Sequence, residues 1–255
     1  MSDQTSIKIP SEISSLMVRS HIYRFIAYSF RRPDLDTTDS KKENGDLSWD
    51  EIVDALPLRN KTRLIGQLKG LLEKLQQTTY KDWVMQYEDC FGYTASGPVP
   101  CYELEYGEEH THREPQQLSD ISSFYHAFGL KVKGDNFERV DHIAIECEFM
   151  HFLLFKESYA LLNAAGENAE ICHQASIRFL QAHLGRWAPS FSLKLSRYTK
   201  QGFFKDLADF TFLYIVQDCE WLGVTAGPED LPIRPVQEKE DSGCVSCSLR
   251  PATPQ

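Results

Sequence analysis

The chain has 255 residues, of which 42% are hydrophobic and 25% charged, and its formal net charge at pH 7 is −10. This length and composition are typical of a soluble protein with one large hydrophobic core. The negative charge disfavours nucleic acid as a partner, because binding would displace few phosphate counterions, and the sequence contains no apolar run long enough for stable membrane insertion.

Apolar residues recur with helical spacing along most of the chain, and we find no convincing alternating strand. In chain order, this spacing predicts helices over residues 13–30, 48–57, 64–75, 82–91, 116–128, 138–165, 167–184, 189–198 and 203–221. The predicted fold class is therefore all-α, with a single bundle of roughly ten helices and flexible termini.

Several helix boundaries carry recognisable signals. Ser48 and Glu51 form a capping-box pattern, while Pro115 and Gly129 bracket the helix predicted between them. The helix over 138–165 is predicted to be the most buried, because residues 149–155 are apolar nearly all round.

The two ends of the chain differ in composition from the middle. Residues 1–9 are polar and predict a flexible N-terminal tail, residues 10–226 predict the helical domain, and residues 227–255 combine prolines with acids and predict a disordered tail. The tail contains Cys244 and Cys247. Since the seven cysteines follow no framework spacing and the first ten residues lack a signal-peptide core, the sequence predicts a cytoplasmic protein with free thiols.

An aromatic and acidic cluster follows the helix that ends near Phe91. Pro98 and Pro100 fix φ and remove backbone donors, so this loop must be extended. Such a loop can hold Tyr102, Glu103 and Tyr106 at a set angle to the flanking helices. That arrangement favours the binding of a peptide over catalysis.

A second polar cluster, Arg139, Asp141, His142 and Glu146, lies at the head of the long apolar helix. Arg139, His142 and Glu146 fall on one helical face that continues into apolar residues, so we expect the cluster at the mouth of an apolar groove. Asp141 and His142 would read a cationic peptide there, with sensitivity near neutral pH. The alternative is an ordinary first helical turn with acids that match the helix dipole.

Two Glu-x-x-His pairs, Glu148 with His151 and Glu170 with His173, raise a metal-binding alternative. Di-iron bundles use this spacing but need a whole helix between the pairs, and residues 152–169 leave room only for a turn. The Cys244–Cys247 pair is a two-ligand spacing, whereas zinc or an iron–sulfur cluster needs about four ligands. A helical metal-binding or redox protein is therefore the alternative function.

Enzyme signatures are missing from the sequence. It contains no Gly-rich phosphate loop followed by Lys-Ser/Thr, no Gly-x-Ser-x-Gly elbow and no dinucleotide-binding fingerprint. We therefore expect no enzyme activity, and no metal or other cofactor is assigned.

At its two polar clusters the chain resembles the redox-enzyme maturation chaperones of the TorD/DmsD/NarJ type. Residues 87–91 with 100–106 resemble the signature Tyr-x-x-Leu-Phe followed by Pro-x-Tyr-Glu-Ser-x-Tyr. Residues 140–150 resemble a Pro-Asp-His-Ile segment that is followed by Glu and Phe-Met. The resemblance covers about residues 10 to 225. Cys90, Leu104 and Val140 depart from the usual Leu, Ser and Pro of these signatures.

The resemblance implies an all-α cytoplasmic assembly chaperone. Such a protein binds the N-terminal or twin-arginine signal peptide of the catalytic subunit of a molybdenum-cofactor oxidoreductase, and supports cofactor insertion and folding before export. The implied peptide-binding residues are Tyr102, Glu103, Tyr106, Arg139, Asp141, His142 and Glu146. A monomer with a possible dimer is also implied, in which residues 131–136 would be the hinge for exchange of helical halves.

Overall fold

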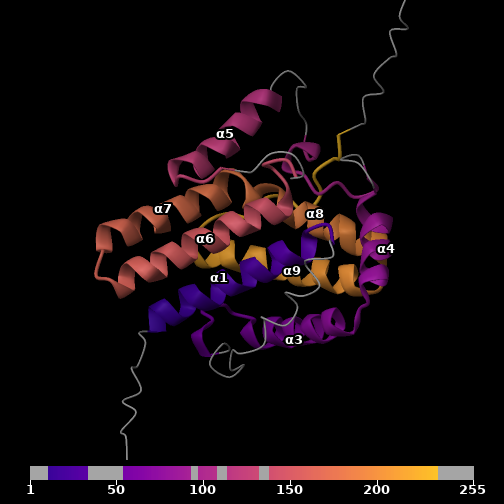
Figure 1. Ribbon diagram of the computed structural model, residues 1–255, viewed down its shortest axis with the longest axis horizontal. Helices are drawn as coiled ribbons and strands as arrows, with labels where there is room; N and C mark the ends of the chain where they lie inside the picture. Colours follow the sequence, from indigo (N-terminus) through magenta and orange to yellow (C-terminus); the bar gives the residue numbers. More distant parts are fainter. Residues whose placement is uncertain (1–10, 34–53, 93–96, 108–113, 132–137, 235–255) are drawn as a thin grey trace, which may run out of the picture.

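The computed structural model describes residues 11–33, 54–92, 97–107, 114–131 and 138–234. The predicted all-α class is confirmed, but these residues contain eight α-helices and one short 3-10 helix (Figure 1) where roughly ten helices were predicted. In chain order the helices are α1 Ser11–Phe30, α3 Lys61–Gln77, α4 Tyr80–Phe91, the 3-10 helix η2 Glu103–Glu105, α5 Glu114–Ala127, α6 Ile143–Leu162, α7 Gly166–Ala182, α8 Leu184–Thr199 and α9 Phe203–Trp221.

Some predictions fall wholly or partly outside these residues. Asp54 and Ala55 are helical, at the end of the short helix predicted over 48–57, but its capping box lies outside the described residues. The predicted N-terminal tail, most of the predicted hinge and the Cys244–Cys247 pair also lie outside them.

Helix α6 lies between α1 and α7, and α9 packs against α8 and α3 (Figure 1). The sequence of α6 is strongly apolar, so the helix buries residues on most of its sides. Among these buried residues are Ile143, Met150, Leu153 and Leu154. In the described part of the chain, no helix is both long and apolar enough to cross a bilayer.

A buried ion pair joins α1 to α9 across the core. Arg19 Nε donates to Asp218 Oδ1 at 2.6 Å, and Arg19 Nη2 donates to Oδ2 at 3.2 Å. The Tyr23 hydroxyl also donates to Asp218 Oδ2, at 2.9 Å. All three side chains are almost completely buried, so each charge depends on the other for its solvation.

Helix α8 begins at Leu184, five residues before the start that Pro189 predicted. Proline has no N–H, so the carbonyl of Gly185 lacks its usual helical donor. The N–H of Gly227 donates to this carbonyl instead, at 2.8 Å. A Cβ at position 227 would lie 2.0 Å from the carbonyl oxygen of Arg186, so the close approach requires glycine.

The first eight residues of the predicted tail, 227–234, are described and lie along α8 and η2. The N–H of Leu231 donates to Ser190 Oγ at 2.9 Å, and the N–H of Arg234 donates to the carbonyl of Glu105 at 2.9 Å. Backbone bonds therefore connect this segment to the loop that carries the first predicted cluster.

Candidate functional site

The two clusters predicted from the sequence meet in the structure. Tyr102 and His142 form an isolated antiparallel bridge, and the N–H of Glu103 donates to the carbonyl of Asp141 at 2.9 Å. The N–H of Ile143 donates to the carbonyl of Cys101 at 2.8 Å. Because Asp141 and His142 form this pairing and lie in a turn that begins at Arg139, α6 begins at Ile143 and not near residue 138 as predicted.

Most of the seven predicted peptide-binding residues are buried. Asp141, His142 and Glu146 have no exposed surface, and Glu103 and Tyr106 are only 8% and 5% exposed. The two partly exposed members are Tyr102 and Arg139. The cluster is thus a contiguous polar core with one accessible edge.

Asp141 organises the accessible edge of this cluster. Its carboxylate accepts two hydrogen bonds from Arg139, at 2.9 and 2.6 Å, and one from the N–H of Leu104, at 3.1 Å. Arg139 also donates to Glu105 at 3.0 Å, and its guanidinium lies 4.6 Å from the centre of the Tyr102 ring. The carboxylate of Asp141 is therefore occupied by partners from its own chain.

His142 is the N-cap of α6 and accepts a hydrogen bond from the N–H of Ala144, at 3.1 Å. Burial lowers the pKa of His142 from 6.5 to about 4, although Glu138 and Asp141 oppose this shift. The imidazole is neutral at pH 7. The expected sensitivity of His142 near neutral pH is therefore wrong, because desolvation outweighs the nearby acids.

Glu146 is a buried acid that shares its surroundings with a second acid. It accepts a hydrogen bond from Trp187 Nε1 at 3.0 Å, while its other oxygen has no partner among the described residues. Burial raises the pKa of Glu146 well above 4.5, and the neighbouring Glu103 raises it further. Glu103 itself lies 3.1 Å from His183 Nδ1.

We expect Glu146→Gln to stabilise the protein most at high pH. A carboxyl whose pKa is raised on folding contributes less stability as pH rises from its ordinary value through the raised one. The amide keeps the acceptor for Trp187 but does not titrate. Urea unfolding at pH 5 and pH 8 should show a gain from the substitution that is larger at pH 8. Equal gains at both pH values would contradict the prediction.

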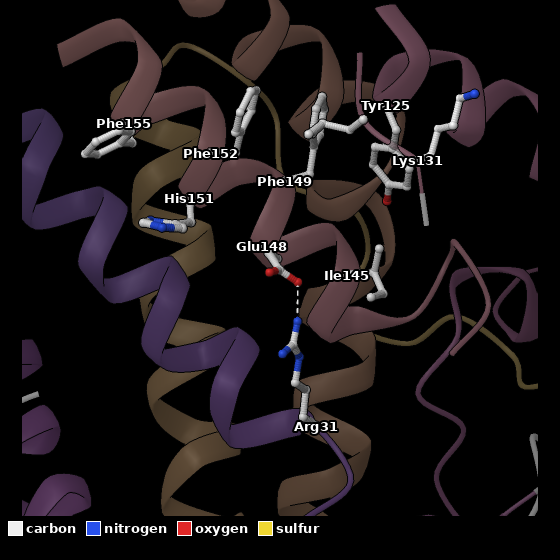
Figure 2. Close-up of a pocket in the computed structure, with 10 residues that line it drawn as sticks. Arg31, Tyr125, Lys131, Ile145, Glu148, Phe149, His151, Phe152 and Phe155 are labelled. Carbon is white, nitrogen blue, oxygen red and sulfur yellow. Dashed lines mark hydrogen bonds and ion pairs between the residues drawn. The ribbon is translucent and has the colours of Figure 1, made fainter. Parts of the chain in front are cut away.

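An open cavity of about 520 Å³ lies beside α6. Figure 2 shows its lining side chains, which come from the end of α1, from α5 and the residues after it, and from α6. The lining residues are Arg31, Tyr125, Leu130, Lys131, Ile145, Glu148, Phe149, His151, Phe152 and Phe155. Of these, only Tyr125 and Phe149 are fully buried.

Aromatic side chains form one wall of the cavity. The rings of Phe149 and Phe152 stack with centroids 6.4 Å apart, and Phe128 packs edge-on against both. Phe155 is 44% exposed. The helix predicted to be the most buried therefore exposes one of its aromatic residues beside the cavity.

Two polar residues of the cavity, His151 and Glu148, differ in their partners and in their exposure to solvent. His151 Nδ1 lies 2.7 Å from Ser20 Oγ, and burial lowers its pKa below 6.5. Glu148 Oε2, by contrast, pairs with Arg31 Nη2 at 2.5 Å, with both side chains about half exposed. The cavity therefore combines an apolar wall with one exposed ion pair.

Sequence reasoning missed most of these residues. Glu148, Phe152 and Phe155 follow one another at i, i+4 and i+7, which places them on one helical face. The sequence did not reveal this exposed face, because residues 149–155 are apolar on both the exposed and the buried side of α6.

The Glu-x-x-His pairs do not converge. His173 Nδ1 lies 3.1 Å from Glu157, and Glu170 accepts a hydrogen bond from Gln174 at 2.9 Å. Among residues that the structure describes, no three metal-ligating side chains gather at one point.

Comparison with known proteins identifies related sequences. The sequence model of the nitrate reductase delta subunit family matches residues 58–192, which is more than half of the chain. A perchlorate reductase assembly chaperone protein from Dechloromonas aromatica (strain RCB) is 29% identical over 119 residues, covering 46% of this chain and 52% of the relative.

Two further relatives match shorter stretches. A selenate reductase assembly chaperone protein from Thauera selenatis is 33% identical over 89 residues, covering 33% of this chain and 45% of the relative. A chlorate reductase assembly chaperone protein from Ideonella dechloratans is 35% identical over 78 residues, covering 31% and 39%. The matches thus span about half or less of each relative's length.

Proposed function

This chain belongs to the nitrate reductase delta subunit family, and we propose that it is an assembly chaperone for the catalytic subunit of a molybdenum-cofactor oxidoreductase. The client segment is the N-terminal or twin-arginine signal peptide of that subunit. The chaperone binds this segment in the cytoplasm and supports cofactor insertion and folding before export.

The observation that carries the proposal is the open aromatic cavity beside α6. Its exposed rings present apolar surface to which the apolar part of a signal peptide is complementary. Micromolar affinity corresponds to about 8 kcal/mol. Burial of a few hundred Å² of apolar surface at about 25 cal/mol per Å² supplies much of that before the entropy of association is subtracted.

The seven residues predicted from the sequence have two roles in this proposal. Tyr102 and Arg139, at the accessible edge, contact the client directly. The five buried members support this region: Glu103 and Asp141 join the loop to the residues before α6. Tyr106 bonds within the loop, His142 caps α6, and Glu146 bonds to Trp187 of α8.

A substitution in the cavity tests the proposal. Phe152→Asp places a charge on the aromatic wall and should weaken binding of a reductase signal peptide by at least about tenfold. Tyr159→Asp is the matched control, because Tyr159 is an exposed aromatic residue of α6 that does not line the cavity. Fluorescence anisotropy with a labelled peptide measures both. Unchanged affinity in Phe152→Asp would remove the cavity from the proposal.

A further inference from the structure

We propose that Glu148 receives an arginine side chain of the bound client segment, and that Arg31 occupies this subsite until the client displaces it. The inference rests on the proposed function, since it names the charge that the same cavity recognises. Recognition of the client's arginine is thereby assigned to Glu148, which lies outside the two polar clusters predicted from the sequence.

The position of Glu148 carries the first step. It is the sole carboxylate among the described residues that line the cavity, and its side chain is 51% exposed. Figure 2 shows the Arg31 side chain reaching from the end of α1 to Glu148, at the edge of the aromatic wall. The acids Asp141 and Glu146, in contrast, are fully buried. An incoming cation therefore meets Glu148 without any rearrangement of the core.

The existing ion pair shows that this carboxylate accepts a guanidinium. Arg31 reaches it through one nitrogen and one oxygen, at 2.5 Å. A carboxylate has room for a two-pronged arginine contact, which is stronger than a single one. An exposed pair of this kind contributes little to stability, so a ligand can replace Arg31 at small cost.

Neither His151 nor Lys131, which also line the cavity, offers a binding site for a cation, whereas Glu148 does. His151 bonds to Ser20, and burial lowers its pKa, which disfavours a positive charge that would repel a cation. Lys131 lies on the opposite side of the cavity, and in Figure 2 its amine points away from Glu148.

The spacing along α6 defines the ligand. Phe152 is four residues after Glu148, which is about 6 Å along the helix axis, and Phe155 follows one turn later. A segment with an arginine directly beside bulky apolar side chains fits this order. The occupant is thus an arginine-bearing apolar peptide.

The chain offers a matched control pair. Arg32, the next residue, pairs with Glu88 of α4 at 3.3 Å, and its side chain is 56% exposed. Neither residue lines the cavity. Substitution of Arg32 or Glu88 removes the same kind of charge as substitution of Arg31 or Glu148, but outside the cavity.

Three synthetic peptides probe the subsite, each a run of leucine and alanine preceded by arginine, citrulline or glutamate. Citrulline has the shape of arginine without its charge. Arg31→Gln should tighten binding of the arginine peptide about two- to fivefold, and Glu148→Gln should abolish its advantage over the citrulline peptide. Arg32→Gln and Glu88→Gln should change neither, and all four variants should melt at the wild-type temperature.

Each contrary outcome has a defined meaning. Equal binding of the arginine and citrulline peptides by Arg31→Gln would overturn the subsite, and so would a preference for the glutamate peptide, which would point to Lys131. If Phe152→Asp still weakened binding of the reductase signal peptide about tenfold or more in either case, the proposed function would stand. If neither the wild-type protein nor any variant bound any of the peptides, both the arginine subsite and the proposed function would be overturned.

Discussion

Replacement of Asp218 with alanine should lower the free energy of unfolding by about 3–5 kcal/mol. The substitution leaves the Arg19 guanidinium buried among apolar side chains, with its carboxylate partner gone. It also removes the acceptor of the Tyr23 hydroxyl, which is completely buried. An uncompensated buried charge is far more costly than the loss of an exposed one.

The control for this substitution lies on the same helix. Asp206, in the first turn of α9, pairs with Lys74, and both side chains are nearly half exposed. Asp206→Ala should therefore cost about 1 kcal/mol or less. Urea unfolding followed by circular dichroism measures both variants. A loss under about 1 kcal/mol for Asp218→Ala would show that water reaches Arg19.

Asp141→Ala should lower the free energy of unfolding by about 2–4 kcal/mol. The buried carboxylate accepts hydrogen bonds from Arg139 and from the N–H of Leu104, and the latter loses its partner. Because Arg139 is partly exposed, water can solvate it in the variant, so the loss is smaller than at Asp218.

Glu105→Ala is the matched control, since Glu105 is a more exposed partner of the same arginine. It should cost about 1 kcal/mol or less. Limited proteolysis should show faster cleavage within residues 97–107 in Asp141→Ala than in Glu105→Ala. Equal stability losses in the two variants would mean that Asp141 does not anchor the loop.

The helical class of the fold could be predicted because apolar spacing is a local property of the chain. Helix boundaries were less predictable where distant segments decide them. Pro189 predicts a helix start by itself, yet α8 begins at Leu184 because Gly227 supplies the missing donor. The start of α6 moved for a similar reason, since Asp141 and His142 pair with the loop near Tyr102.

The candidate site was predictable only in part. The family resemblance implied one set of peptide-binding residues from the clusters around Tyr102 and Asp141, and the two clusters do meet. It could not reveal that most of these residues are buried, because an acid reads as exposed until its partner is known. The exposure of Phe155 was equally hidden, since nothing in a run of aromatic residues states which ring a neighbouring helix covers.

The bond between Arg19 and Asp218 also sets an order of events during synthesis. The two residues are 199 positions apart, so α1 leaves the ribosome long before its partner exists. At about 5–20 residues per second, this interval is on the order of 10 to 40 seconds. During that time the charged side chain of Arg19 lacks the carboxylate with which it pairs in the folded core. A protein that we propose to protect the unfinished chain of another subunit thus carries an unpaired arginine in its own first helix until α9 has been made.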